Sequence, residues 1–179
     1  MSSDTVVVVG SGSRAAEWAT RLLASGFDVV ADDRTLPQAV QHCWPAAERM
    51  GLFPGASPDR LVLGITAQHL ADARLVQVVG DAAVPATDAL VATDATAHAL
   101  SPIHLVPVVV LADGPHTAAL AHFYEGIGMA PCLPGTPADE VHRMGQGLID
   151  VTGSDPDSII AVMRALRATG VGAGPSMAA

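Results

Sequence analysis

A short stretch near the amino terminus has the residue types and spacing needed to bind a pyrophosphate. Gly10, Gly12 and Ala15 form a G-x-G-x-x-A pattern that includes Ser11 and follows the apolar run Val6–Val9. The first glycine of such a pattern permits a tight turn, and the second lets the backbone approach a phosphate. The small third residue lets the next helix lie close to the sheet. The pattern predicts a dinucleotide site built from these four residues.

An acidic pair lies where a ribose-binding carboxylate is expected. A helical pattern follows the glycines and ends at Gly26, and the stretch 27–31 then leads into Asp32 and Asp33. Either aspartate lies about 20 residues beyond the glycines, where a carboxylate accepts hydrogen bonds from both hydroxyls of an adenosine ribose. We predict that Asp33 is the carboxylate that binds the ribose. A negative charge there would repel a 2′-phosphate, so the predicted cofactor is NAD(H). The alternative is a βαβ unit with a tight turn and no nucleotide.

Composition excludes several classes of protein. The 179 residues fit one domain with a modest appendage, and the formal charge of −9 argues against binding to nucleic acid or to an anionic membrane. No apolar run approaches the ~20 residues of a membrane span. A basic, apolar leader is missing at the start, and Cys43 and Cys132 lie far apart. These features predict a reduced, cytoplasmic setting. The chain has no lysine, which rules out Schiff-base and P-loop lysines.

Alternating strand and helix patterns predict an α/β fold with a Rossmann-type, mostly parallel sheet and a short helical appendage. The expected later strands are 60–66, 74–80, 88–94, 103–113 and 130–133, and the expected helices are 36–52, 116–128, 138–151 and 155–169. Pro45 implies a kink in the first of these helices or a division into two short ones. We expect a nucleotide-binding domain over residues 1–136 and a truncated helical segment over 137–179.

Five further segments resemble one enzyme family. They are CWPAAERMGLFPGASPDRL (43–61), LADARLVQVV (70–79), DALVATDAT (88–96), LVPVVVLADGPHT (105–117) and FYEGIGMAPCLPG (123–135). With the amino-terminal pattern, they make the chain similar to the 3-hydroxyacyl-CoA dehydrogenase superfamily, and most similar to its L-carnitine dehydrogenase branch. The chain resembles that family in a shortened and partly degenerate form, because only residues 80–87 stand where the family has a helix between two strands.

The resemblance implies a catalytic site. In the family, a histidine removes the proton from the substrate hydroxyl as hydride passes to NAD. A glutamate orients the histidine, while serine and asparagine side chains hold the substrate oxygen. The histidine falls on His98, the serine hydroxyl on Thr96 and the asparagine on Ser101. The orienting glutamate falls on Val110, which cannot orient an imidazole, and a second family glutamate falls on Gln77.

Other residues offer alternatives to this site. Asp94 or Asp113 could supply the missing carboxylate, and His104 is a rival for the base. The remaining histidines and the cysteines lack the spacing of metal ligands, so no metal is expected.

Three functions follow as hypotheses. The first is a minimal NAD-dependent oxidoreductase acting on a small 3-hydroxy acid or its thioester, with an altered catalytic site. The second is an inactive nucleotide-binding partner protein. The third is a non-redox acid–base enzyme, an isomerase, cyclase or lyase that reuses the cleft. The apolar stripe formed by Ile159, Val162, Met163 and Leu166 also predicts a homodimer joined through the C-terminal helices.

Overall fold

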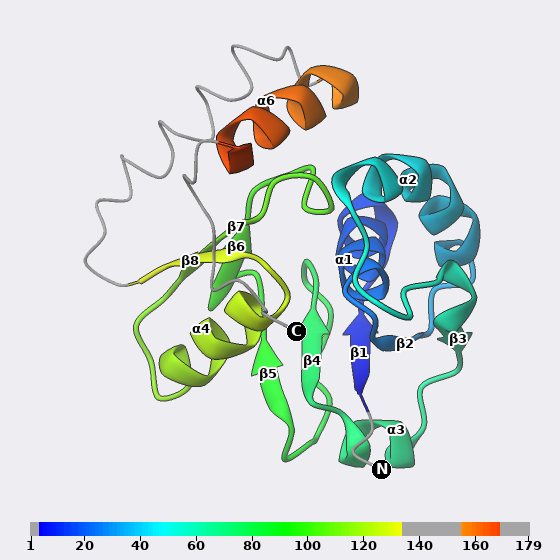
Figure 1. Ribbon diagram of the computed structural model, residues 1–179. Helices are drawn as coiled ribbons and strands as arrows, with labels where there is room; N and C mark the ends of the chain where they lie inside the picture. Colours follow the sequence, from blue (N-terminus) through cyan, green and yellow to red (C-terminus); the bar gives the residue numbers. More distant parts are fainter. Residues whose placement is uncertain (1–3, 134–154, 169–179) are drawn as a thin grey trace.

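The structure is a computed structural model that describes residues 4–133 and 155–168. Its larger sheet is parallel and has the strand order β3-β2-β1-β4-β5. The strands are β1 (Thr5–Val9), β2 (Asp28–Ala31), β3 (Leu61–Leu63), β4 (Leu75–Val78) and β5 (Leu90–Ala92). The order reverses direction between β1 and β4 (Figure 1). This architecture confirms the predicted α/β fold with a Rossmann-type sheet.

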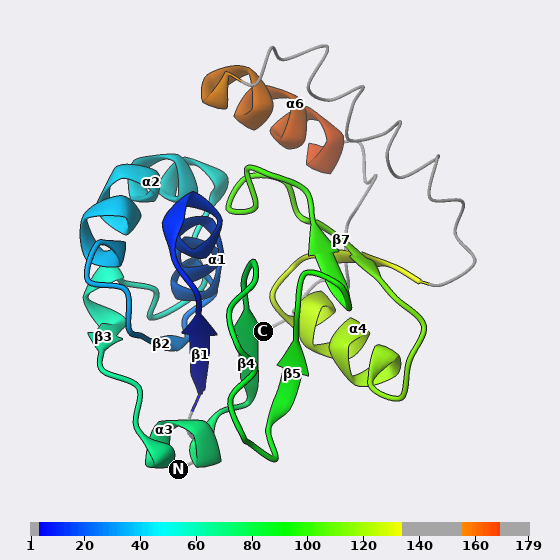
Figure 2. The same cartoon turned by 180° about the vertical axis from the view of Figure 1, so that it is seen from behind.

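A smaller sheet stands beside the first. In it, β7 (Val108–Leu111) pairs antiparallel with β6 (Ala97–Ala99) and parallel with β8 (Ala130–Cys132). Helix α4 (Thr117–Gly126) connects β7 to β8 and lies next to them (Figure 2). The catalytic candidates from the sequence lie on β6 and on the turns at its two ends.

The core of the larger sheet is formed by β-branched residues that are buried on both faces. Val6, Val7 and Val8 are fully buried, as expected for the central strand of a parallel sheet. Val7 pairs with Val30 of β2 and with Val76 of β4. This register brings the carboxyl ends of β1, β2 and β4 to one edge, where the glycine pattern begins.

Two helices lie side by side, and the first of them packs against β1 and β2 of the larger sheet. They are α1 (Gly12–Ala24) and α2 (Leu36–Met50), and they contact each other along their lengths (Figure 1). Trp18, Leu22 and Leu23 of α1 are fully buried. Helix α2 continues through Pro45 as one element, so the alternative of two short helices is wrong.

The connections around β4 are short. Helix α3 (Ala67–Asp72) precedes β4, and residues 79–89 join β4 to the parallel strand β5 without a described helix. The Thr87 hydroxyl donates a 2.9 Å hydrogen bond to the carbonyl of Leu70, which ties this crossover to α3. Parallel strands usually need a dozen or more connecting residues that include a helix. The connection between β4 and β5 is therefore as short in the structure as the sequence indicated, and it contains no described helix.

The strand expected over residues 103–113 is much shorter in the structure. Only Val108–Leu111 forms β7. The amides of Leu105 and Val106 both donate to the carbonyl of Pro102, so the chain turns there. Pro107 has no N–H for a ladder, which explains why the strand begins after it. His104 consequently lies in a buried turn and not in a strand.

Helix α6 (Pro156–Ala168) packs on its own chain, against α2 and the turn that leads into β7 (Figure 1). The amide of Ser158 donates a 2.9 Å hydrogen bond to the Asp155 carboxylate, which is the cap expected from the sequence. Ile159 and Ile160 are buried in a cluster with Met50, Leu105 and Val106. The helix expected at 138–151 lies outside the described residues, and the division at residue 136 stays a prediction.

Within residues 4–133 and 155–168, no helix is long and apolar enough to cross a membrane.

Candidate nucleotide-binding site

The two glycines of the loop between β1 and α1 have different surroundings. Both have a positive φ, 125° for Gly10 and 83° for Gly12. A Cβ added to Gly10 would lie 2.6 Å from the Val79 carbonyl oxygen, so this backbone packs directly on the end of β4. A Cβ added to Gly12 would meet nothing within 4 Å. Gly12 thus leaves open space at the start of α1, where a phosphate can approach the backbone.

The other predicted contact residues of this loop take different positions. Ser11 is the exposed residue that precedes α1, and its side chain makes no capping hydrogen bond. Ala15 is fully buried, which lets α1 lie close to the sheet.

Asp33 faces the glycine loop. Its carboxylate accepts a 3.3 Å hydrogen bond from the amide of Gly12 and bonds of 2.9 and 2.8 Å from the amide and hydroxyl of Thr35. The hydrogen bonds from Thr35, helped by the one from Gly12, hold the pKa of Asp33 below its ordinary value. Asp32 instead accepts a 2.7 Å bond from the amide of Ile65. Of these two aspartates, Asp33 is the one that contacts the glycine loop, and its role as the ribose acceptor stays a prediction.

Arg14 of helix α1 forms hydrogen bonds with residues that follow the edge strand β5. Its Nε donates a 2.8 Å hydrogen bond to the Asp94 carboxylate, and its Nη2 donates at 3.1 Å to the carbonyl of Ala99. The second oxygen of Asp94 accepts a 2.8 Å bond from the amide of Gly80. Asp94, weighed from the sequence as a carboxylate partner for a catalytic histidine, is bound to Arg14 instead.

His98 is exposed on the middle of β6, where it pairs directly with Val110 of β7. Directly paired residues of antiparallel strands have side chains on the same face. The family resemblance places the orienting glutamate at Val110 and the histidine at His98. These two positions therefore lie side by side. The role of His98 stays a prediction, and the Val110 side chain beside it has no polar atom with which to orient an imidazole.

The two predicted hydroxyl donors both make hydrogen bonds within the protein. Thr96 accepts a 2.9 Å bond from the amide of Thr93 and closes a tight turn before β6. Ser101 donates a 2.8 Å bond to the Glu17 carboxylate, which also accepts a 3.0 Å bond from the amide of Ile103. These contacts place the hydroxyls at opposite ends of β6. They do not converge on one acceptor in this structure.

A buried imidazole lies close to Glu17. His104 is 8% exposed, and its Nδ1 has no hydrogen-bond partner among the described residues. Burial lowers the pKa of His104, the charge of Arg21 lowers it further, and Glu17 opposes both. Sequence reasoning missed Glu17 because nothing in its spacing distinguishes it from a solvent-facing helix residue. The nearby turn containing Pro102 supplies its partners.

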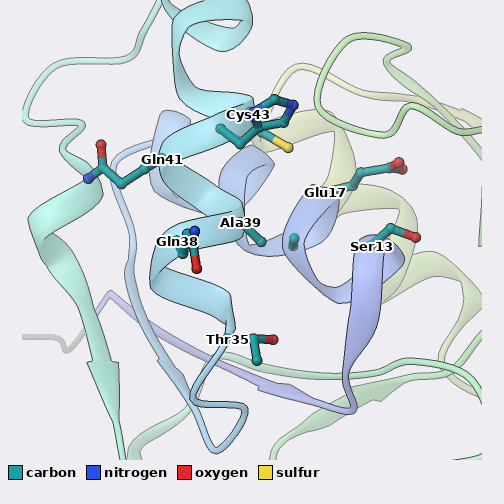
Figure 3. A pocket seen from close by; sticks show the side chains of 9 residues that line it. Ser13, Glu17, Thr35, Gln38, Ala39, Gln41 and Cys43 are labelled. Carbon is teal, nitrogen blue, oxygen red and sulfur yellow. The ribbon is translucent and has the colours of Figure 1, made fainter.

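A cavity of about 650 Å³ lies between α1 and α2 (Figure 3). Its lining residues are Ser13, Ala16, Glu17, Thr35, Gln38, Ala39, Gln41, His42 and Cys43. Figure 3 shows the Cys43 sulfur turned toward α1 and Gln41 pointing away from it. Burial raises the pKa of the Cys43 thiol, with a further contribution from Glu17. Ser13 and Thr35 place one end of the cavity next to Gly12 and Asp33.

Gln77 is part of the core. Its side-chain oxygen accepts a 2.8 Å bond from the hydroxyl of Tyr124, and both residues are fully buried. Burial, followed by the charge of Asp94, raises the pKa of Tyr124. In the part of the chain that the structure describes, no three acidic, histidine or cysteine side chains are grouped to hold a metal ion.

Comparison with known proteins finds relatives among dehydrogenases. The chain is 32% identical to an L-carnitine dehydrogenase of Burkholderia mallei, over 77% of this chain and 58% of that enzyme. It is 29% identical to an L-carnitine dehydrogenase of Bacillus cereus, over 75% of this chain and 55% of the enzyme. The chain thus spans less than two thirds of these relatives. No protein-family model matches it.

Solved structures show the same fold. An (S)-3-hydroxybutyryl-CoA dehydrogenase from Ralstonia eutropha superposes with a TM-score of 0.56 at 16% identity, covering 92% of this chain and 87% of that one. A 3-hydroxybutyryl-CoA dehydrogenase from Escherichia coli gives 0.54 at 18% identity, covering 72% and 37%. An NAD⁺-dependent pyridine carboxylic acid 5-dehydrogenase gives 0.55 at 18% identity, covering 94% and 71%.

The sheet order and the glycine loop define the class: an α/β protein with a Rossmann-type sheet. Within that class, the chain is related to the L-carnitine dehydrogenases and matches a little more than half of their length. The resemblance to the 3-hydroxyacyl-CoA dehydrogenase superfamily expected from the sequence is confirmed.

Proposed function

We propose that this chain is an NAD(H)-binding protein derived from the 3-hydroxyacyl-CoA and L-carnitine dehydrogenases. The observation that carries the proposal is the contact between Asp33 and the amide of Gly12 beside open space at Gly12. A ribose that approaches Asp33 meets an ionised carboxylate able to accept from both of its hydroxyls. The pyrophosphate then lies over the amino-terminal end of α1, where backbone N–H groups attract negative charge.

Any oxidoreductase activity would use an altered site. When bound, NAD supplies a hydride acceptor for oxidation of a small 3-hydroxy acid or its thioester. In that reaction His98 is the base that removes the hydroxyl proton, and Thr96 and Ser101 are the hydroxyls that hold the substrate oxygen. Val110 beside His98 gives the imidazole no acidic partner. Loss of the acid behind a catalytic histidine costs a serine protease about 10⁴ in rate. We therefore propose slow turnover.

A second candidate function is nucleotide binding without redox chemistry, either as a partner protein or as an acid–base isomerase, cyclase or lyase. The engagement of Ser101 by Glu17 and of Thr96 by Thr93 favours it, because neither hydroxyl is presented to a common substrate atom.

Titration with NADH followed by turnover assays separates these candidates. The substrates are L-carnitine and 3-hydroxybutyryl thioesters, chosen from the relatives. Saturable binding with slow turnover on either substrate supports the oxidoreductase. Saturable binding with no turnover leaves the second candidate. Failure to detect binding at millimolar NADH overturns the proposed nucleotide site, the oxidoreductase and the nucleotide-binding partner protein. It leaves only an acid–base enzyme that works without NAD.

We also propose a homodimer joined through the C-terminal helices, in a cytoplasmic setting and without nucleic acid. Ile159 and Ile160 are already covered by their own chain, so a dimer contact must use the outer side of α6. Ala161 is exposed and Val162 is half-buried. The two free cysteines, Cys43 and Cys132, support a reducing compartment.

A further inference from the structure

Arg14 connects the start of α1 to the segment that follows β5, the edge strand of the larger sheet. It belongs to the first turn of α1, which follows β1 directly. Its partner Asp94 follows β5. Asp94 also accepts a hydrogen bond from the amide of Gly80, which follows β4. In the order β1-β4-β5, these three points lie along the carboxyl edge of neighbouring strands. Strands are about 4.8 Å apart, so the pair extends over roughly 10 Å of that edge.

A bound dinucleotide would need the same edge. Ligands of doubly wound sheets lie outside the carboxyl ends of the strands, at the point where the strand order reverses. That point is between β1 and β4. The adenosine half is expected on the β2 side, because Asp33 follows β2 and contacts Gly12. The second half must then extend past the glycine loop toward the ends of β4 and β5. The Arg14 side chain already lies along this course.

We infer that the Arg14–Asp94 ion pair determines which half of a bound dinucleotide the protein contacts. With the pair closed, the adenosine diphosphate half makes its contacts at Gly12 and Asp33, and the nicotinamide half adds none. The pair must open before the nicotinamide riboside can lie over β4 and β5. This inference rests on the proposed NAD(H) site. It names the recognised ligand class as compounds that contain adenosine diphosphate, ADP-ribose included.

The bonding of the pair explains why it stays closed and why it can open. Arg14 donates to Asp94 and to the carbonyl of Ala99, and the second Asp94 oxygen accepts from Gly80. Both side chains are 25% exposed, so water screens their attraction in part. A partly exposed pair with these added bonds reduces the population of the open form, in which Arg14 and Asp94 are apart, about 5-fold. The apparent affinity for a ligand that binds only the open form falls by the same factor.

The test measures ADP-ribose and NADH binding by calorimetry. The wild type is expected to bind the two ligands with affinities within about 3-fold of each other. Arg14→Gln and Asp94→Asn each remove the ion pair and should tighten NADH about 5-fold while leaving ADP-ribose unchanged. Unchanged ADP-ribose binding also shows that the variant is folded. Arg60→Gln is the matched control, because Arg60 forms a 2.8 Å pair with Asp28 at the start of β2, away from this edge.

Two results overturn the inference. One is a wild type that binds NADH at least tenfold more tightly than ADP-ribose. The other is an equal change in both affinities in Arg14→Gln and Asp94→Asn, which would make the pair a general support of the loop. If the wild type binds neither ligand, the proposed nucleotide site itself is wrong. That outcome is distinct from a change in the preference between ligands.

Discussion

The backbone nitrogen of Gly12 lies 3.3 Å from the carboxylate of Asp33. This contact joins the end of β2 to the loop between β1 and α1, and it places a negative charge beside the open side of the glycine loop. Thr35 holds the same carboxylate through two further hydrogen bonds. The result is a hydrogen-bond acceptor fixed beside the glycine loop, at the site that we propose for an adenosine ribose.

Asp33→Ala should weaken NADH binding far more than NADPH binding. The substitution removes two charge-assisted hydrogen bonds to the ribose, a loss of about 10- to 100-fold in affinity. NADPH gains little from Asp33 because its 2′-phosphate is repelled. Asp32→Ala is the control, since Asp32 binds the amide of Ile65 and should alter stability without altering the preference. Equal losses for both cofactors in Asp33→Ala would mean that the ribose contact is misassigned.

The two loop glycines should respond differently to substitution. Gly12→Val should abolish NADH binding, because its side chain enters the open space beside the loop, while the positive φ costs roughly 1–2 kcal/mol of stability. Gly10→Ala should instead destabilise the whole fold, because its Cβ would lie 2.6 Å from the Val79 carbonyl oxygen. Thermal unfolding and NADH titration of both variants check this. Normal nucleotide affinity in a folded Gly12→Val protein would contradict it.

His104 should make the fold less stable as the pH falls. Its folded-state pKa is lowered, so between that value and the ordinary value near 6.5 the unfolded state binds more protons. Stability is therefore greatest above about pH 6.5 and decreases below it, by at most about 1.4 kcal/mol per pH unit for one site. His104→Gln should show a smaller decrease in the free energy of unfolding between about pH 7 and pH 5.5. Parallel curves for wild type and variant would refute the prediction.

If the protein has turnover, His98→Ala should remove it and leave NADH affinity within a few-fold. The reason is that His98 lies on β6 and not at the glycine loop. A larger effect of His104→Ala, in a variant that still binds NADH, would show that the wrong histidine was chosen as the base.

Val110→Glu should raise any turnover at least about tenfold. Directly paired side chains of antiparallel strands have Cβ atoms about 4.5–5.5 Å apart, so the new carboxylate would stand beside His98. Val110→Gln is the matched control, because it adds similar bulk without the charge. Steady-state assays with L-carnitine and 3-hydroxybutyryl thioesters provide the measurement. An equal effect of both substitutions would exclude a role for the charge.

Light scattering should give a particle of twice the 18.2 kDa chain mass. Met163→Glu with Leu166→Glu, chosen from the sequence stripe, should yield monomer or unfolded protein. Ile160→Glu should lower stability in any assembly state, because Ile160 is 2% exposed within its own chain and an unpaired charge there is unfavourable. A wild-type monomer at micromolar concentration would show that packing of α6 on α2 is sufficient.

Several elements were predictable because their signals are local. Asp155 caps α6, and the strands at 74–80 and 88–94 contain β4 and β5. The strand predicted over 103–113 was too long, because the amides of Leu105 and Val106 turn back to Pro102. Sequence periodicity does not distinguish that buried turn from a buried strand, since both are apolar.

By itself, the sequence determined the βαβ unit, the glycine loop and the dehydrogenase relationship. Contiguous residues encode all three, through strand-forming valines, a helix stop at Gly26 and an acid at the end of β2. Tertiary structure decided which aspartate meets the loop, since Asp32 and Asp33 differ only in the direction of their side chains. It also decided that Arg14 binds Asp94 and that Glu17 binds Ser101, partners 80 and 84 residues apart. Such contacts depend on where the turns at the two ends of β6 lie relative to α1, and no local pattern specifies that placement.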